Sequence, residues 1–303
     1  WYVAAGSGNL WKTTNAGTTW TPLFEDQGAY SLGCVTIDPH DPSTIWLGTG
    51  ENVGGRHVGY GDGVYRSRDG GASWENLGLK ASEHIGTIIV HPDDPGVVYV
   101  ACQGPLWSAG GERGLYKSTD GGASWNKILG GGEYTGVNEV RMDPRDPDVL
   151  YATTHQRFRN VAALVNGGPE TAIHKSTDGG STWRKLTKGL PKEDRGKIGL
   201  AISPQKPDVI YATIELGHRK GGFYRSTDGG ASWENATTSF PVAPARIITR
   251  RSSPVRTSST ASTRWTSDCT SPTTAARHFA SSAIAPNTAT TTPWPSARTI
   301  LIT

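Results

Sequence analysis

Four polar segments of the chain carry the side chains best suited to binding or catalysis. They occupy residues 51–63, 103–114, 155–171 and 215–222. Each offers a carboxylate or an amide just after an apolar run, together with at least one arginine. Such groups can hold a polar ligand, and two carboxylates facing each other roughly 5–9.5 Å apart can cleave a glycosidic bond. The binding candidates are Glu51, Arg56, Glu112, Arg113, His155, Arg157, Arg159, Glu215, His218 and Arg219.

Catalytic residues cannot be assigned from these segments. Glu51, Glu112, Glu170 and Glu215 supply carboxylates, but their order in the sequence does not tell whether any two face each other. A solvated polar rim therefore stands beside a ligand-binding groove and a catalytic cleft as an interpretation of the same residues.

Metal, cofactor and serine chemistry are not indicated. His57, His84, His155 and His218 do not have the spacing of metal ligands. The glycine-rich string GTGENVGG is not followed by a helical pattern, as a phosphate-binding loop would be. No Gly-x-Ser-x-Gly sequence occurs in residues 1–240. We therefore expect neither a metal site nor a cofactor.

One phrase recurs along the chain and reveals the elements that position these segments. It reads YRSRDGGASW at 65–74, KSTDGGASW at 117–125, HKSTDGGSTW at 174–183, YRSTDGGASW at 224–233 and, more weakly, WKTTNAGTTW at 11–20. The closing tryptophans Trp20, Trp74, Trp125, Trp183 and Trp233 are 54, 51, 58 and 50 residues apart. A period of this length is typical of propeller blades.

A second phrase lies between the copies of the first. Examples are VTIDPHDPSTIWLGTG at 35–50 and VRMDPRDPDVLYATTHQ at 140–156. Each copy has a β-branched run, a turn of Pro and Asp, and a second β-rich run, which predicts two antiparallel strands. A third strand follows at GVYRS, GLYKS, AIHKS and GFYRS, and a fourth begins at the tryptophan. Four strands in every ~50 residues predict an all-β fold, a β-propeller of four-stranded antiparallel blades.

The repeated aspartates have a structural interpretation. Asp69, Asp120, Asp178 and Asp228 each fall in the turn between the third and fourth strands. There a carboxylate can accept hydrogen bonds from the turn, while the glycines supply positive φ. The tryptophan that follows can fill the space between neighbouring sheets. A site repeated in every blade could not converge on one substrate, so we do not predict chemistry for these aspartates.

Strand direction places the polar segments opposite these turns. In an antiparallel four-stranded blade, the 1–2 and 3–4 turns lie on one face, and the 2–3 loops and blade-to-blade connections lie on the other. The four polar segments are all 2–3 loops, which we expect to be irregular. Variable polar loops on one face of a rigid scaffold are where binding sites usually form.

The repeated phrase S/T-x-D-x-G-x-S/T-W resembles the Asp-box, or bacterial neuraminidase repeat. This repeat occurs in sialidases, in xyloglucan-cleaving endoglucanases and in the luminal propeller of sortilin-type receptors. The longer phrases GTGENVGGRHVGYGDGVYRSRDGGASW and GERGLYKSTDGGASW are similar to large secreted bacterial proteins described as sortilin-like or as glycosyl hydrolases. The resemblance covers residues 1–240 and implies a propeller in an extracytoplasmic or secreted protein.

Two functions follow from the resemblance. The first is a binding scaffold for a glycan or polypeptide ligand on the 2–3 loop face, and the second is a glycoside hydrolase. The Arg-Ile-Pro motif of sialidases is absent, and the first blade lacks the Asp-Gly-Gly strand end that resembles an endoglucanase base. Both absences favour the binding scaffold, although further blades could supply the missing parts.

Charge and composition limit the classes of binding partner that we expect. Residues 241–303 contain seven arginines and one aspartate, a net charge of +6, so residues 1–240 carry 23 basic and 26 acidic groups, a net charge of −3. A slightly acidic body gives no reason to expect a nucleic-acid partner. No run of 18 apolar residues suggests a membrane span. The three cysteines, Cys34, Cys102 and Cys269, are too few for a disulfide framework.

The composition changes abruptly after Phe240. Residues 241–303 have no Gly, Lys, Glu or Tyr, and 24 of the 63 residues are Ser or Thr. This segment can be a Ser/Thr/Pro-rich linker, or the product of a frameshift near Phe240–Val242. In the second interpretation TSPTTAARHF (270–279) is compatible, one base out of frame, with HVTDDGGKTF, a further copy of the repeat.

We favour the frameshift, which leaves residues 241–303 without an evolved fold and residues 1–240 as part of a larger propeller. The N-terminal WYVAAGSG has the pattern of a strand interior, which suggests that blades also precede it. An intact reading frame in the gene through codons 240–242 would exclude the frameshift.

Overall fold

The repeat phrases form five sheets in a computed structural model that describes residues 1–217, 221–237 and 299–302. Two predicted site residues, His218 and Arg219, lie outside the described residues, as does most of the predicted tail, residues 241–298 and 303. All described residues belong to one compact unit of the chain.

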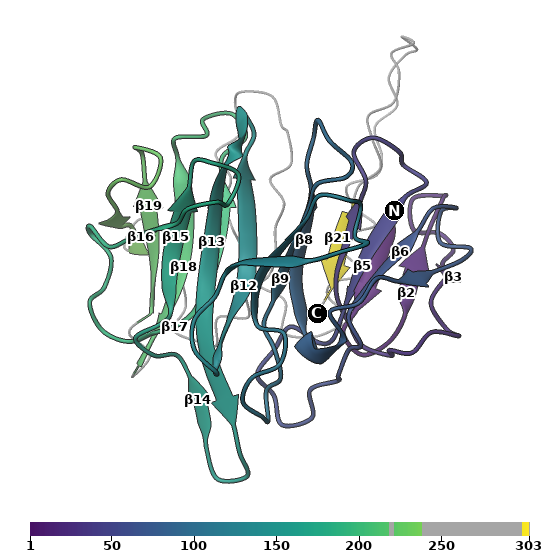
Figure 1. Ribbon diagram of the computed structural model, residues 1–303, viewed down its shortest axis with the longest axis horizontal. Coiled ribbons are helices and arrows are strands. Elements are labelled where there is room, and N and C mark those ends of the chain that lie inside the picture. The colour runs from purple at the N-terminus through teal and green to yellow at the C-terminus, as the bar shows by residue number, and fades with distance from the viewer. Residues whose placement is uncertain (218–220, 238–298, 303) are drawn as a thin grey trace. The chain divides into compact units, whose positions relative to one another are not determined.

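Each sheet is called a blade and numbered in chain order (Figure 1). Blade 1 contains β1 (Tyr2–Ala5), β2 (Leu10–Lys12), β3 (Thr21–Pro22) and β21 (Thr299–Ile302). Blade 2 contains β4 (Leu32–Ile37), β5 (Ile45–Thr49), β6 (Val64–Ser67) and β7 (Glu75–Asn76). Blade 3 contains β8 (Ile85–Val90), β9 (Val98–Cys102), β10 (Gly114–Ser118) and β11 (Asn126–Leu129).

Blade 4 contains β12 (Thr135–Asp143), β13 (Asp146–Arg159), β15 (Ala172–Ser176) and β16 (Arg184–Leu186), with β14 (Leu164–Asn166) paired to the end of β13. Blade 5 contains β17 (Arg195–Ile202), β18 (Ile210–Leu216), β19 (Gly222–Ser226) and β20 (Glu234–Asn235). One turn of 3-10 helix, η1 (Lys80–Ser82), lies between blades 2 and 3.

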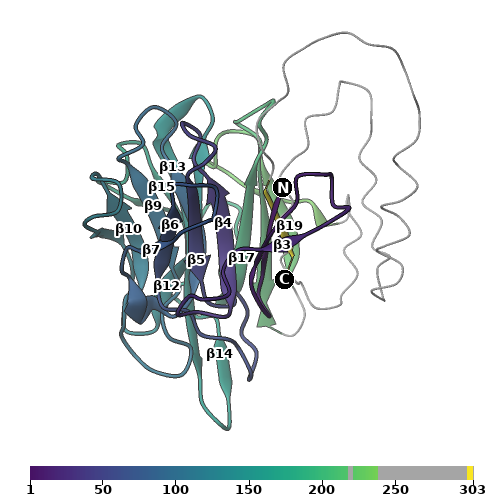
Figure 2. The same ribbon diagram turned by 90° about the vertical axis from the view of Figure 1, so that its right-hand side faces the viewer.

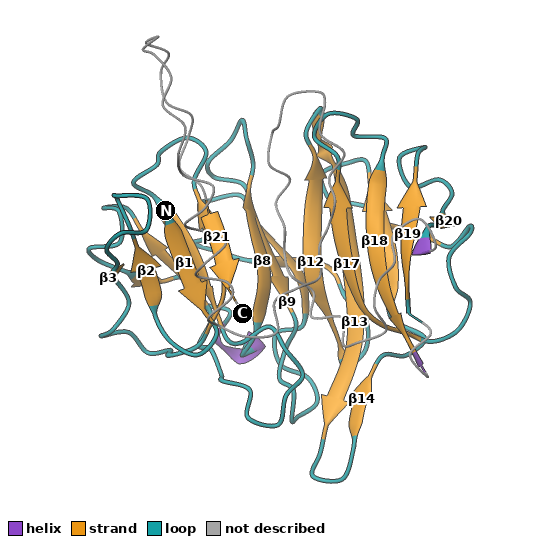
Figure 3. Ribbon diagram, turned by 180° about the vertical axis from the view of Figure 1, so that it is seen from behind, coloured by secondary structure: helices purple, strands orange, loops and turns teal. Residues whose placement is uncertain are grey.

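Blades 2 to 5 each pair their four strands antiparallel in chain order, which confirms the predicted all-β propeller of four-stranded blades. In blade 1, β21 pairs with β1 in parallel, with Tyr2 opposite Thr299. The first strands of successive blades lie against one another: β4 contacts β8, β8 contacts β12 and β12 contacts β17. Figure 3 shows β8, β12 and β17 from behind, side by side.

Glycines allow the first strands to approach closely. A Cβ atom added to Gly33 would collide with the carbonyl of Ile85 in the next blade, and one added to Gly86 would collide with the carbonyl of Asn138. The short distance between first strands therefore requires residues without side chains at these positions.

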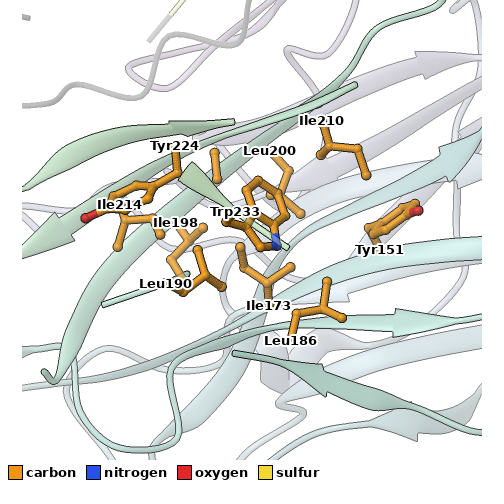
Figure 4. Close-up of a cluster of buried hydrophobic side chains, with 11 residues drawn as sticks. Tyr151, Ile173, Leu186, Leu190, Ile198, Leu200, Ile210, Ile214, Tyr224 and Trp233 are labelled. Atoms are coloured by element: carbon orange, nitrogen blue, oxygen red, sulfur yellow. The ribbon is translucent and has the colours of Figure 1, made fainter. Parts of the chain in front are cut away.

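The hydrophobic core is divided into one cluster for each blade interface. Figure 4 shows the cluster between blades 4 and 5, where Tyr151 and Ile173 of blade 4 pack with Ile198, Ile210 and Trp233 of blade 5. The other clusters lie between blades 1 and 2, blades 2 and 3, and blades 3 and 4. Each blade is thus stabilised by burying apolar side chains against its neighbours.

The closing tryptophans belong to these interfaces. Trp74 and Trp125 pack at the edges of their clusters and donate their indole N–H to the carbonyls of Leu23 and Leu77, at 2.9 and 2.8 Å, in the preceding blades. Trp183 also packs against a cluster, and Trp233 is buried. Trp20 of blade 1 differs, because 39% of its surface is exposed.

The repeated phrases form five similar turns, the repeat turns, at residues 13–20, 67–74, 118–125, 176–183 and 226–233. In the second of them, Asp69 Oδ1 accepts hydrogen bonds from Ser67 Oγ at 2.8 Å and from the Ser73 amide at 2.9 Å. Asp120, Asp178 and Asp228 make equivalent bonds. Gly70 and Gly71 have φ of 71° and 96°, which favour glycine.

A recurring set of hydrogen bonds, here called the inter-blade latch, joins the repeat turns of blades 2 to 5 to the preceding blade. The carbonyl of Gly229 accepts from Tyr151 Oη at 2.8 Å and from Lys175 Nζ at 2.9 Å. Gly179 accepts in the same way from Tyr99 and Lys117, Gly70 from Tyr2 and Lys12, and Gly121 from Arg66. In blade 2, Trp46 replaces the tyrosine, and the Arg66 guanidinium lies 5.3 Å from its ring.

The latch and the aspartates occupy one face, the turn face. The repeat turns of blades 2 to 5 also bond to the 1–2 turns of their own blades; the Gly121 amide, for example, donates to the Gly96 carbonyl at 2.9 Å. The Gly179 amide donates likewise to the Asp148 carbonyl at 3.0 Å. The two kinds of turn therefore lie side by side.

The 2–3 connection of blade 4 differs from the irregular loop expected for residues 155–171. β13 continues to Arg159 and pairs with β14, with Phe158 opposite Val165. The side chain of Asn160 accepts from the amides of Ala162 and Ala163 and so closes the turn. In Figures 1, 2 and 3 this hairpin projects beyond the other strands. The turn residues 160–163, NVAA, lack the Asn-Gly or Asp-Gly signal that would have predicted a hairpin here.

Acid should weaken the repeat turns. Hydrogen bonds, chiefly from the Ser124, Thr182 and Ser232 hydroxyls, lower the pKa of Asp120, Asp178 and Asp228 to about 2, from the ordinary 3.8. A carboxylate with a lowered pKa contributes stability above its unfolded-state pKa and loses it as the pH falls through its folded-state pKa. We expect the urea midpoint to fall between pH about 4 and about 2, and to fall less in Asp178→Asn than in the wild type. The matched control is Asp194→Asn at an exposed position, and equal pH profiles for the three proteins would contradict this role.

Candidate functional site

The 2–3 connections and the blade-to-blade connections meet on the face opposite the repeat turns, here called the loop face. The amide of Gly61, in a 2–3 connection, donates to the carbonyl of Glu83, in the connection between blades 2 and 3, at 2.8 Å. The Gln103 amide donates to the His84 carbonyl at 2.9 Å. Hydrogen bonds of this kind fix the loops against one another, so their side chains have defined positions.

Two of the candidate arginines are buried and bind backbone carbonyls. Arg157 donates to the carbonyls of Val53 and Gly104 at 3.2 and 3.1 Å, and so joins the loops of three blades. Arg113 donates within its own loop, to the carbonyls of Gln103, Pro105, Ser108 and Gly110. Burial lowers the pKa of Arg157 to about 9, and it remains charged at neutral pH. Both guanidinium groups therefore stabilise the loops of this face.

The loop of blade 2 is held from across the propeller. Lys197 Nζ, on the first strand of blade 5, donates to the backbone and side-chain oxygens of Asn52, both at 2.7 Å. Gln103 Nε2 of blade 3 donates to the same side-chain oxygen at 2.5 Å. With the bond from Arg157 to Val53, residues 52–53 are thus bound by blades 3, 4 and 5. These bonds, here called the tie at residues 52–53, hold this part of the loop face in place.

The candidate carboxylates accept hydrogen bonds from nearby loops. Glu51 accepts from the Gly59 amide at 3.1 Å, and Glu112 from the Ala81 amide at 2.8 Å. Glu170 accepts from the Gly132 amide at 3.0 Å and from the Thr135 hydroxyl. Glu215 accepts from Asn166 Nδ2 at 2.9 Å. Each carboxylate therefore orders a loop of the face.

Glu83 differs from the other carboxylates of the loop face. It ends η1 with φ of 58°, in the left-handed region, and its surface is partly buried. Burial raises the pKa of Glu83, while the positive charges of Arg113 and Arg157 oppose the shift. A carboxyl with a raised pKa can serve as a proton donor at a higher pH than an ordinary glutamate.

The buried imidazoles of this region are neutral. Burial, reinforced by the charge of Arg157, lowers the pKa of His84 to about 3, and burial lowers the pKa of His155 far below its ordinary value. His155 Nε2 lies 3.1 Å from Asn166 Oδ1, whereas the ring of His84 is tilted by 51° against that of Tyr60, with ring centroids 6.2 Å apart. Neither imidazole provides a cation for an anionic ligand near neutral pH.

Aromatic side chains give the loop face apolar surface beside its polar groups. Tyr60 is 56% exposed. Trp107 is half-buried, and the Arg159 guanidinium lies 5.9 Å from the centre of its ring. Tyr134 and Phe158 pack edge to face at 4.9 Å. Rings of this kind present a negative face to the C–H groups of a sugar, and adjacent polar groups can bind its hydroxyls.

The remaining predicted residues have less defined surroundings. Arg56 Nη2 lies 3.4 Å from the carbonyl of Val161 at the tip of the β13–β14 hairpin. His218 and Arg219 lie outside the described residues. The site also contains four residues that the sequence analysis did not single out: Asn52, Glu83, Trp107 and Lys197. Glu83 lies in a blade-to-blade connection and Lys197 on a first strand, so inspection of the 2–3 loops could not identify them.

Within the described residues, no group of three or more His, Cys, Asp or Glu side chains is arranged to hold a metal ion. The same part of the chain contains no helix of the length and apolarity needed to cross a membrane. Cys34 and Cys102 are both buried, and neither forms a disulfide with a described residue.

The fold and the loop face define a β-propeller with a polar, aromatic-bearing surface opposite its repeat turns. Comparison with family models matches Sortilin-Vps10 (sortilin, neurotensin receptor 3) over residues 62–190 and 114–247. Together the two matches cover more than half of the 303 residues. The chain therefore belongs to the Sortilin-Vps10 family.

Curated relatives are xyloglucanases. The chain is 24% identical over 216 residues to a xyloglucanase of Paenibacillus sp, covering 61% of this chain and 19% of the relative. It is 30% identical over 211 residues to a xyloglucanase of Hypocrea jecorina, covering 60% of this chain and 24% of the relative. The chain thus spans about a quarter or less of the length of these relatives.

A solved structure supports the same fold. The crystal structure of an ancestral GH74 enzyme matches with a TM-score of 0.51 and 22% identity, over 72% of this chain and 25% of that chain. The protein is therefore a propeller related to those of glycoside hydrolases, as well as a member of the Sortilin-Vps10 family.

Removing the Arg157 guanidinium should destabilise the fold. Arg157→Met leaves the carbonyl of Gly104, in a buried bond, and that of Val53, in a partly buried bond, without this donor. The buried carbonyl alone costs about 1–3 kcal/mol. Urea unfolding at neutral pH measures the loss. Arg56→Met is the matched control, and we expect it to change stability by no more than about 0.5 kcal/mol. Equal losses in the two variants would show that the bonds of Arg157 do not support the loop face.

Proposed function

We propose that this chain forms a glycan-binding part of a glycoside hydrolase-related protein that acts outside the cytoplasm. The observation that carries the proposal is the match of about 60% of the chain to proteins named xyloglucanases. A β-linked plant-type polysaccharide is therefore the ligand class to test first. The resemblance to secreted bacterial proteins supports the extracytoplasmic location.

The loop face is the proposed binding surface. Tyr60 and Trp107 offer ring faces to sugar residues, and Arg159 beside Trp107 offers hydrogen-bond donors. The tie at residues 52–53 and the buried Arg157 hold the loops in place before a ligand arrives, which reduces the entropy lost on binding. Of the ten predicted site residues, Arg56 and Arg159 are in this proposal direct contacts, whereas Arg113 and Arg157 act by positioning the loops.

The hydrogen bonds that the carboxylates already accept favour binding over cleavage. Glu51, Glu112, Glu170 and Glu215 each order a loop, so using one as an acid or a nucleophile would cost that loop its support. The second candidate function is glycoside cleavage, with Glu83 as the proton donor. The raised pKa of Glu83 favours it, and the opposing carboxylate would come from further parts of a longer protein.

Substitution of the aromatic residues tests the proposed surface. We expect the full chain to bind soluble xyloglucan in affinity electrophoresis or calorimetry, more tightly than starch or a basic peptide. Trp107→Ala should weaken binding by about tenfold, as expected for an aromatic anchor. Trp1→Ala, at an exposed position on the turn face, is the matched control.

Equal binding by the wild type and Trp107→Ala would contradict the placement of the site, and binding of peptide alone would contradict the ligand class. Release of reducing ends from xyloglucan by the wild type but not by Glu83→Gln would establish cleavage in place of simple binding.

A further inference from the structure

The loop face keeps its arginines apart from its carboxylates. Within the described residues, ion pairs to carboxylates are made by four arginines outside this face: Arg66, Arg141, Arg145 and Arg225. Four arginines of the loop face make no ion pair in the same part of the chain: Arg56, Arg113, Arg157 and Arg159. The carboxylates of the loop face accept hydrogen bonds from amides and neutral side chains. The positive charge of this face is therefore available to an anionic ligand.

Arg159 has a fixed position and unused donors. Its amide donates to the carbonyl of Leu106 at 2.8 Å, and it pairs with Leu164 in the β13–β14 hairpin. Its guanidinium lies 5.9 Å from the centre of the Trp107 ring. Among the described residues its side chain has no hydrogen-bond acceptor, and its Nε is buried. A guanidinium that is held against a ring, with its N–H groups unused, suits a carboxylate.

Arg56 brings a second guanidinium to the same hairpin from the loop of blade 2. Arg56 is exposed, and its Nη2 lies 3.4 Å from the carbonyl of Val161, two residues beyond Arg159. This long bond is the single hydrogen bond of the Arg56 side chain within the described part of the chain. Most of its N–H groups are therefore available to a ligand. Blades 2 and 4 thus present two guanidinium groups at the same end of one hairpin.

The surface beside Arg56 is open. Among the described residues, a Cβ atom added to Gly55 would meet nothing within 4 Å, and one added to Gly54 would meet only Leu164 of the hairpin, at 3.9 Å. Neither glycine has a positive φ. Unlike the glycines between the first strands, these two are required neither by the backbone conformation nor by packing. Close approach of a ligand to the backbone is a further reason for glycine.

Two buried arginines add positive charge next to this surface. Arg157 binds the carbonyl of Val53, the neighbour of Gly54, and its Nε is buried without an acceptor among the described residues. Arg113 and Arg157 are each 2% exposed, and both donate to backbone carbonyls, which carry no net charge. The half-buried Glu83 is the carboxylate whose charge acts on both guanidinium groups. One carboxylate leaves an excess of positive charge, which attracts an anion more strongly in this low-dielectric region than in water.

We propose that Arg56 and Arg159 bind the carboxylate of a uronate-bearing polysaccharide, whose sugar chain lies over the glycines at 54–55. The inference rests on the proposed glycan-binding function and specifies its ligand as an acidic polysaccharide. A guanidinium donates two parallel hydrogen bonds to a carboxylate, and such charged bonds are about twice as strong as neutral ones. The open glycine surface and the ring of Trp107 suit a sugar chain. The relatives named xyloglucanases favour a glycan over an acidic peptide.

A matched pair of polymers tests the proposal on the full chain. The pair is xyloglucan and the same xyloglucan after partial oxidation of its primary hydroxyl groups to carboxylates, so that the two differ in uronate content alone. In calorimetry at low salt, the wild type should bind the oxidised polymer at least about tenfold more tightly than the neutral one. Added salt should reduce this acid preference, because it screens the charges.

Substitution of the arginines locates the acid preference. Arg56→Met with Arg159→Met should bind the two polymers equally. Arg159→Lys alone should keep part of the preference, because it retains the charge and loses the planar pair of donors. Arg184→Met, at an exposed position on β16, is the matched control and should keep the full preference. Urea unfolding verifies that each variant is folded.

The possible failures are distinct. Equal binding of the two polymers by the wild type would overturn the proposal and leave the glycan-binding function intact, whereas binding of neither polymer would overturn both. An acid preference that survives in Arg56→Met with Arg159→Met would overturn the assignment to these arginines. Binding of poly-glutamate in place of the oxidised polymer would show that an acidic peptide, not a polysaccharide, is the ligand.

Discussion

The hydrogen bonds between each repeat turn and the preceding blade are the interaction on which the rest of the structure depends. A short four-stranded blade has no core of its own, and it becomes stable by burying both faces against neighbours. Apolar burial is not directional, so it does not by itself set how one sheet is rotated against the next. The latch supplies that direction, because a lysine or arginine, in most blades with a tyrosine, must reach one carbonyl.

The aspartates make that carbonyl available. By accepting the Ser73 amide and hydroxyl, Asp69 closes its turn without using the carbonyl of Gly70. Positive φ at the two glycines then turns the carbonyl toward the preceding blade. Charge-assisted bonds from Lys12 and its equivalents are stronger than bonds between neutral groups, which suits a contact that must fix an angle. The repeated phrase therefore serves to fix the conformation of the turn and the direction of its carbonyl.

The loop face has a different design, in which the bonds differ from blade to blade. Arg157 binds the carbonyls of two other loops, and Lys197 binds Asn52 across 145 positions of sequence. These bonds hold dissimilar loops in one arrangement, so the exposed groups between them can vary without loss of the scaffold. A regular turn face and an irregular loop face together explain how related propellers can share a fold and differ in ligand.

The local rules of the chain were predictable, and its long-range contacts were not. Alternating β-rich runs, Pro/Asp turns and the tryptophan spacing predicted four-stranded blades, because each signal acts within a few residues. The same inspection named Arg113 and Arg157 as ligand contacts, since residue type does not reveal whether a guanidinium meets a ligand or a carbonyl. Lys197 escaped notice because its partner Asn52 lies in another blade. The frameshift predicted after Phe240 concerns residues that lie almost entirely outside the described part of the chain, and it stays a prediction.

The most direct measurement of the central claim is hydrogen–deuterium exchange in Tyr151→Phe with Lys175→Met, which removes one latch and leaves every turn sequence unchanged. If the latch orients blade 5, amides in residues 226–233 and in β17 should exchange faster than in the wild type, while those of the repeat turn at 118–125 keep their wild-type rates. Unchanged exchange in residues 226–233, or equal acceleration in all blades, would contradict the claim.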